Sequence, residues 1–198
     1  MPDSVPAFEV PVGSSALLLM DFQVSIVESV AKDNSGVVER AAKLGAAARQ
    51  RGIPVILVCI GFREGYSDVN PRNKSFGTLK ASGRFLPGSP GTAIHPALAA
   101  QAQDWIVTKR RVSAFAGSDL EFLLRARGIS TLLLAGLSTS GVVLSTLRQA
   151  ADLDYRVGVV ADCCGDTDPE VHRVLTEKIF PRQAEVLDSA AALALLKA

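Results

Sequence analysis

Short apolar segments recur along this chain, and segments with helical periodicity separate most of them. Several of these segments are apolar almost throughout, which is typical of strands that are buried on both faces of a parallel sheet. The six predicted strands span residues 15–22, 53–60, 104–110, 131–137, 156–162 and 184–188. Because helices that connect parallel strands cover both faces of the sheet, the pattern predicts a three-layer α/β/α sandwich with about six strands.

Local signals place the helices between these strands. Asn34 is expected to cap one helix, and Ser118 with Glu121 has the spacing of a capping box. The predicted helices span residues 35–51, 119–127, 141–154, 169–180 and 190–198. Residues 61–103 form a stretch longer than an ordinary loop, and we expect it to carry function or local structure, with a helical turn over residues 76–83.

The length, net charge and residue counts of the chain exclude several classes of function. The 198 residues suffice for one domain, expected to span residues 1–198, and the net charge of +1 gives no electrostatic case for a nucleic-acid or membrane partner. The N-terminus lacks a secretory pattern and no apolar stretch is long enough to span a bilayer, so we expect a cytoplasmic protein. Three cysteines and two histidines without ligand spacing predict neither a disulfide framework nor a metal site, and we expect no cofactor.

The sequence lacks the motifs that are common where a strand, a tight turn and a helix follow one another. The first strand lacks the GxGxxG of dinucleotide-binding folds, and the turn STSG lacks the lysine of a phosphate-binding loop. GLSTSG resembles a nucleophile elbow only in part, since Ser140 stands where its second glycine belongs. A serine triad would also need His172, which falls within a predicted helix.

An acid and a base remain at the ends of two strands. Asp21 ends the first strand and Lys109 ends the third, and ligands of open parallel sheets bind beyond the carboxyl ends of the strands. A carboxylate and an ammonium that meet there shift each other's pKa and can transfer protons. The spacing fits equally well a structural salt bridge, or an Asp21 that caps a helix.

Three ordered motifs resemble one known family. They are ALLLMDFQ, IVTKRRVSAFAGSDLEFLLRARGI and TLLLAGLSTSGVVLSTLRQAADLDYRVGVVADCCGD. The chain is similar over residues 15–188 to the isochorismatase-like hydrolases, also called the cysteine hydrolase superfamily, which includes nicotinamidases. The resemblance implies an Asp, a Lys and a Cys as the catalytic set, and it assigns the first two roles to Asp21 and Lys109.

The family's cysteine falls at position 142, where this chain has valine. Valine has neither an acidic proton nor a lone pair, so covalent chemistry is excluded at Val142. Isochorismatases of this family also lack the cysteine and split a vinyl ether, with the Asp as general acid and water as the attacking group. They usually have glycine where this chain has Val142, and valine fills part of that room.

The resemblance also implies a cis peptide bond between Leu137 and Ser138. Together with a helix N-terminus, such a turn would aim the amides of Ser138 and Val142 at an anion or a polarised carbonyl. Alternatively, the hydroxyl groups of Ser138, Thr139 and Ser140 simply cap the helix. Ser140 as a substitute nucleophile would need an adjacent base.

The remaining pocket residues are expected near these strand ends. Phe22, Gln23, Phe115 and Ser140 are predicted to line the pocket, although both phenylalanines fit the core equally well. Arg63 belongs to a cationic segment that could recognise a carboxylate as a lid, or form a solvated loop or a subunit contact. The segment combines Arg63, Arg72, Lys74, Lys80 and Arg84 with Phe62, Tyr66 and Phe76. It lacks the histidines of the family's metal-binding nicotinamidases.

We therefore expect a hydrolase of a small molecule, which can carry a carboxylate, with Asp21 and Lys109 as acid and base and no covalent intermediate. One alternative is a catalytically silent relative that binds small molecules or acts as a scaffold. Another is an amidohydrolase with a relocated nucleophile, for which Cys59 is the candidate, because Cys163 and Cys164 read as small buried residues. The resemblance also implies a homo-oligomer.

Overall fold

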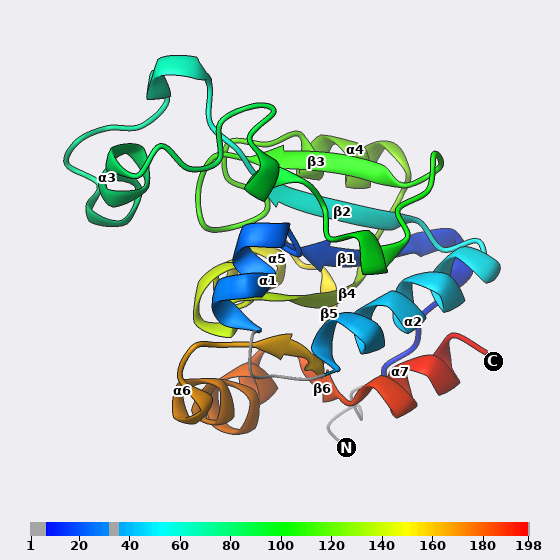
Figure 1. Ribbon diagram of the computed structural model, residues 1–198. Helices are drawn as coiled ribbons and strands as arrows, with labels where there is room; N and C mark the ends of the chain where they lie inside the picture. Colours follow the sequence, from blue (N-terminus) through cyan, green and yellow to red (C-terminus); the bar gives the residue numbers. More distant parts are fainter. Residues whose placement is uncertain (1–6, 32–35, 198) are drawn as a thin grey trace.

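The computed structural model describes residues 7–31 and 36–197 and contains one six-stranded sheet (Figure 1). The strands are β1 (Ser15–Met20), β2 (Val55–Ile60), β3 (Trp105–Lys109), β4 (Thr131–Leu137), β5 (Arg156–Gly165) and β6 (Glu185–Leu187). They lie in the order β3-β2-β1-β4-β5-β6, and every neighbouring pair is parallel. This arrangement confirms the predicted parallel α/β sandwich.

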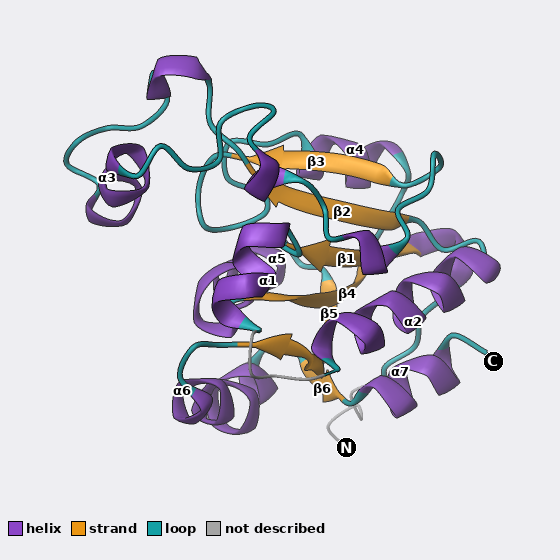
Figure 2. Ribbon diagram, viewed as in Figure 1, coloured by secondary structure: helices purple, strands orange, loops and turns teal. Residues whose placement is uncertain are grey.

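Helices cover both faces of the sheet (Figure 2). One face carries α1 (Val24–Val30), α2 (Val37–Gln50) and α7 (Ser189–Leu195). The other carries α4 (Leu120–Ala126), α5 (Leu144–Asp152) and the π-helical turn Leu175–Ile179 that continues α6 (Pro169–Val174). Figure 1 shows α3 (Lys74–Ala81) projecting beyond the end of the sheet. Within the described residues, no helix has the length and hydropathy needed to cross a bilayer.

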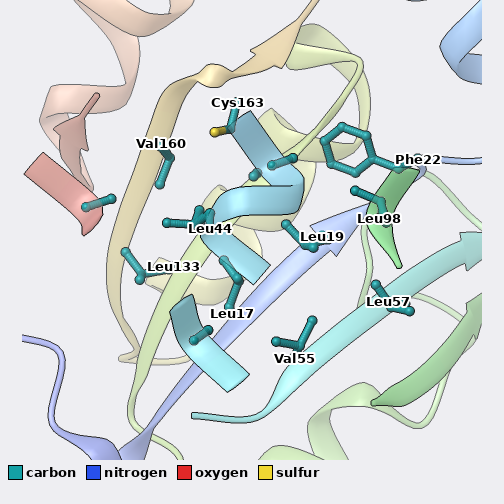
Figure 3. Packing of buried hydrophobic residues seen from close by; sticks show 14 of the residues in the cluster. Leu17, Leu19, Phe22, Leu44, Val55, Leu57, Leu98, Leu133, Val160 and Cys163 are labelled. Carbon is teal, nitrogen blue, oxygen red and sulfur yellow. The ribbon is translucent and has the colours of Figure 1, made fainter. Parts of the chain in front are cut away.

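Strand periodicity divides the interior into two cores. Successive side chains of a strand point to opposite faces, so Leu17 and Leu19 enter the core beneath α2, and Leu18 and Met20 enter the core beneath α5. All four are fully buried or nearly so. Figure 3 shows the first of these cores, where Leu17 and Leu19 pack with Leu44 of α2. Burial on both faces explains why β1 has no alternating polar residues.

The chain reverses direction across the sheet between β1 and β4. Strands β2 and β3 lie on one side of β1, whereas β4 to β6 lie on the other. Because the connections leave β1 and β4 in opposite directions, a crevice opens at their carboxyl ends, and ligands of such sheets usually bind there. The topology therefore places the exits of β1 and β4 next to each other in the candidate site.

The long segment between β2 and β3 has structure of its own. Its aromatic side chains form a third, small core, in which the Phe62 ring lies 5.7 Å from Tyr66 and 5.6 Å from Phe76. The Tyr66 hydroxyl donates a hydrogen bond of 2.8 Å to the carbonyl of Arg84. The helical turn predicted over residues 76–83 is α3, which Asn73 caps through the amide of Phe76.

Several local predictions need correction. Asn34 lies outside the described residues, and α2 begins at Val37. The predicted capping box is wrong, because the Ser118 hydroxyl accepts from the Leu120 amide at 3.3 Å instead of from the Glu121 amide, while the Glu121 carboxylate pairs with Arg125. Helix α1 was not predicted. The helix expected over residues 141–154 is a π-helical turn, Thr139–Val143, followed by α5.

A buried ion pair fastens α2 to the chain before β3, and it carries a stability prediction. Arg49 donates to both carboxylate oxygens of Asp104 at 2.9 and 2.8 Å, and both side chains are almost fully buried. Asp104→Ala would leave the Arg49 guanidinium buried without its partner, so we expect the free energy of unfolding to fall by about 3–5 kcal/mol. Urea denaturation of the purified variant measures this loss.

The matched control for this prediction is Glu121→Ala, which breaks the exposed pair with Arg125. Exposed pairs of this kind contribute little, so we expect a change within about 0.5 kcal/mol. Equal losses in the two variants would contradict the role assigned to the Arg49–Asp104 pair.

Candidate active site

A cavity of about 250 Å³ lies at the carboxyl ends of β1, β3 and β4. Asp21 follows β1, Lys109 ends β3, and the turn after β4 contributes Ser138 and Val142. Helix α1 and the segment between β2 and β3 complete its walls with Ile26, Ser29, Val30, Phe76, Leu79, Arg84 and Phe85. The cavity therefore brings together the motif residues of three separate strands.

Asp21 and Lys109 form a buried ion pair in this cavity. The Lys109 Nζ lies 2.9 Å from Asp21 Oδ2 and also donates to the Arg111 carbonyl at 3.1 Å. The two residues are only 6% and 1% exposed, so water can stabilise neither charge. Among the described residues, Asp21 Oδ1 has no hydrogen-bond partner. This buried oxygen therefore has an unmet capacity to accept a hydrogen bond.

Burial raises the pKa of the Asp21 carboxyl above its ordinary value. The charge and hydrogen bond of Lys109 act in the opposite direction and offset part of this effect. A carboxyl with a raised pKa keeps its proton to higher pH and can donate it. An acid with this property, in contact with a cation and next to a cavity, is typical of a catalytic site.

The turn after β4 is held by side chains on both of its sides. The peptide bond between Leu137 and Ser138 is cis, and the Ser138 hydroxyl accepts a hydrogen bond from the Gly141 amide at 3.1 Å. Thr139 Oγ1 lies 2.8 Å from His172 Nδ1, and the Ser140 amide donates to Asp166 at 2.7 Å. Ser138 therefore caps the helix that follows, which is one of the two alternatives predicted for this turn.

Val142 stands where the family resemblance places the nucleophile. Its side chain is 2% exposed, lines the cavity and packs in the core beneath α5. A side chain added at Gly136 would meet the Met20 carbonyl oxygen at 2.8 Å and Val142 Cγ1 at 3.4 Å, so this part of the wall is tightly packed. The cavity thus presents an aliphatic surface where a thiol would otherwise stand.

Two aromatic residues expected to line the pocket lie in the core instead. Phe22 packs against residues such as Leu19 and Leu98, as Figure 3 shows. Phe115 belongs to the core of the opposite face, and its ring centroid lies 6.0 Å from that of Tyr155. Both assignments to the pocket are therefore corrected, because the large apolar rings are buried between a helix layer and the sheet.

Three polar residues expected at the pocket also lie elsewhere. Gln23 binds both the amide and the carbonyl of Ile60, at 2.8 and 3.0 Å, and so ties the end of β1 to the end of β2. Arg63 lines a separate, outer cavity and its side chain is 68% exposed. Ser140 is exposed and lies outside the cavity lining. Gln23 is thus occupied by backbone groups, whereas the side chains of Arg63 and Ser140 lie in solvent.

The walls include residues that were not predicted, among them those of α1 and Leu79 and Phe85. The apolar spacing of Ile26 and Val30 is a helical signal in the sequence, because residues four apart share a face. Leu79 and Phe85 reach the cavity only through the fold of the segment between β2 and β3. Their positions depend on tertiary packing and have no local signature.

The three thiols lie outside the cavity lining. Cys59 lines a neighbouring cavity, and burial raises the pKa of its thiol to about 12. Cys163 is part of the core in Figure 3, and burial also raises its pKa. Cys164 donates a hydrogen bond to the Val160 carbonyl. Within residues 7–31 and 36–197, no group of three His, Cys, Asp or Glu side chains is placed to hold a metal ion.

The pKa of Cys59 gives a reactivity prediction. A thiol with a pKa of about 12 instead of 9 has about a thousandfold less thiolate at pH 8, and the thiolate is the reactive form. We expect iodoacetamide to leave Cys59 of the folded protein unmodified under conditions that alkylate free cysteine, as followed by mass spectrometry. The urea-unfolded chain is the control, and alkylation of folded Cys59 at the rate of the unfolded chain would contradict the prediction.

Comparison with known proteins identifies the family of the chain. The family model described as "Isochorismatase domain" matches residues 15–191. An uncharacterized isochorismatase family protein, YecD of Escherichia coli O157:H7, is 35% identical, covering 87% of this chain and 91% of its own. The maleamate amidohydrolase of Pseudomonas putida is 30% identical over 87% of this chain and 82% of its own. An isochorismatase family protein from Burkholderia thailandensis has a TM-score of 0.82 and 30% identity, with 97% and 100% of the two chains covered. The chain therefore belongs to the isochorismatase family of hydrolases.

Proposed function

We propose that this protein hydrolyses a small molecule with Asp21 as the general acid, Lys109 as its charged partner and water as the nucleophile. The observation that carries the proposal is the buried Asp21–Lys109 pair, 2.9 Å apart, beside a cavity whose nucleophile position is Val142. A hydrolase without a thiol in its cavity must activate either the substrate or water directly. Asp21 has the raised pKa that the first route requires.

Cleavage of an enol ether illustrates the chemistry. In the protonated form that its raised pKa favours, Asp21 donates its proton to the terminal carbon of the double bond, and the electron pair of that bond forms the new C–H bond. The positive charge develops on the adjacent carbon and the ether oxygen, and Lys109 stabilises the carboxylate that remains. Water then adds to the cationic carbon and loses a proton to the Asp21 carboxylate, and the resulting hemiketal collapses to a ketone and an alcohol. General acid catalysis of this kind typically contributes about 10²–10⁴ in rate.

The cavity supports a substrate with a carboxylate and an apolar body. The Arg84 side chain lines the cavity, with its guanidinium 4.8 Å from the centre of the Phe85 ring. Among the described residues, no carboxylate lies within salt-bridge distance of Arg84. Guanidinium groups bind carboxylates in a bidentate manner, and Phe76 and Leu79 supply apolar contacts nearby. The similarity to an amidohydrolase supports hydrolysis of a small molecule.

Val142 specifically favours a second candidate, a relative that binds a small molecule without turning it over. An aliphatic side chain at the nucleophile position removes the covalent step and narrows the cavity. In that case Asp21 and Lys109 serve only to bind and orient the ligand. The two candidates differ in product formation and share the same cavity.

Substitutions at Asp21 and Lys109 distinguish the hydrolase from the relative that binds without turnover. A panel of small enol ethers and amides with a carboxylate is incubated with the protein, and products are detected by mass spectrometry. We expect Asp21→Asn and Lys109→Ala each to lower turnover by at least about 10²-fold, because the proton donor or its charged partner is lost. Cys59→Ser is the matched control and retains activity, since Cys59 lines a different cavity.

Turnover that survives both Asp21→Asn and Lys109→Ala would contradict the proposed chemistry. Saturable binding of a panel member without any product in the unmodified protein would favour the second candidate. Calorimetry on the unmodified protein measures that binding directly.

A further inference from the structure

A second cavity, of about 710 Å³, lies on the outer side of the segment between β2 and β3. Its walls include Arg63, Asp68, Asn70, Arg110 and Arg111. None of its lining residues lines the cavity with Asp21 and Lys109, so the two are separate sites. We propose that this outer cavity binds a small molecule with a phosphate group.

Charge is the first argument for a phosphate ligand. Three arginines and one aspartate line the cavity, which leaves a surplus of two positive charges around it. The Asp68 carboxylate is already engaged, because Arg110 Nε lies 3.2 Å from its Oδ2 and the Arg63 amide donates to both of its oxygens. A phosphate group with nearly two negative charges balances the surplus better than one carboxylate does.

The placement of Arg111 is the second argument. Its guanidinium donates to the carbonyls of Arg110 and Asp68, at 2.6 and 3.0 Å, and lies 5.6 Å from the centre of the Phe76 ring. Among the described residues, no carboxylate lies within salt-bridge distance of Arg111. The backbone contacts fix the planar group in one orientation, so less entropy is lost when it binds an anion.

Arg63 supplies a more adaptable contact at the rim. Its side chain is 68% exposed, and its distance of 4.0 Å from Asp68 is at the limit of an ion pair. A weak surface pair of this kind contributes little, so an arriving phosphate can replace it at small cost. The volume exceeds what a phosphate ion fills, so room remains for an organic group on the ligand.

Titration calorimetry with inorganic pyrophosphate tests the proposal. We expect saturable binding to the full chain that weakens as the salt concentration rises, since the contacts are charged. Arg63→Gln and Arg111→Gln should each weaken binding at least about tenfold, because each removes a charge-assisted hydrogen bond. Arg63 is exposed, so its variant is expected to fold normally and decides the test if Arg111→Gln does not fold.

The matched control is Arg125→Gln, which removes one positive charge from the exposed surface of α4. This variant should bind pyrophosphate as tightly as the unmodified protein. Absence of saturable binding to the unmodified protein would overturn the proposal, as would Arg63→Gln and Arg111→Gln variants that bind as tightly as Arg125→Gln.

Discussion

The buried contact between Asp21 and Lys109 is the interaction on which the rest of the site depends. The two residues extend from β1 and β3, which are not neighbours, so their side chains meet beyond the end of β2. Two opposite charges in a dry interior are tolerated only with close geometry and further hydrogen bonds. Here the Arg111 carbonyl binds the ammonium, and Gln23 fixes the end of β2 through Ile60. Much of the local backbone thus holds one ion pair in place.

The surroundings of the ion pair determine which chemistry it can support. A salt bridge on the surface would lower the pKa of its carboxyl, whereas burial raises the pKa of Asp21 in spite of Lys109. Val142 contributes an inert wall, and the thiol of Cys59 lies in another cavity with a pKa that makes it unreactive. Acid catalysis on a bound small molecule is the chemistry that this combination supports, and it requires no covalent intermediate.

The sheet and the strand-end residues could be predicted from the sequence because their signals are local or topological. Apolar segments locate the strands, and parallel topology brings Asp21 and Lys109 to one edge. The pocket walls could not be predicted in the same way. Phe22 and Phe115 have the same apolar character whether they line a pocket or fill a core, and only packing decides between these places. Arg84 was one of several cations in its segment, and the fold of that segment places it at the cavity.

The predictions of the capping box and of helix starts were wrong for a related reason. Ser118 and Glu121 have the spacing of a capping box, yet the Ser118 hydroxyl binds the Leu120 amide and the Ala114 carbonyl, and Glu121 binds Arg125. Alternative side-chain hydrogen bonds of this kind differ little in free energy. The spacing of residues in the sequence therefore does not predict which of them forms.

The central claim is that Asp21 is a proton donor, and its ionisation can be measured without a known substrate. Carbon-13 NMR of protein labelled at its aspartate carboxyls follows each resonance with pH, and Asp21→Asn assigns the one that belongs to Asp21. We expect that resonance to titrate with a midpoint above the ordinary value of 3.8, because burial outweighs the opposing effect of Lys109. A midpoint at or below 3.8 would identify the pair as a structural salt bridge and contradict the proposed role of Asp21.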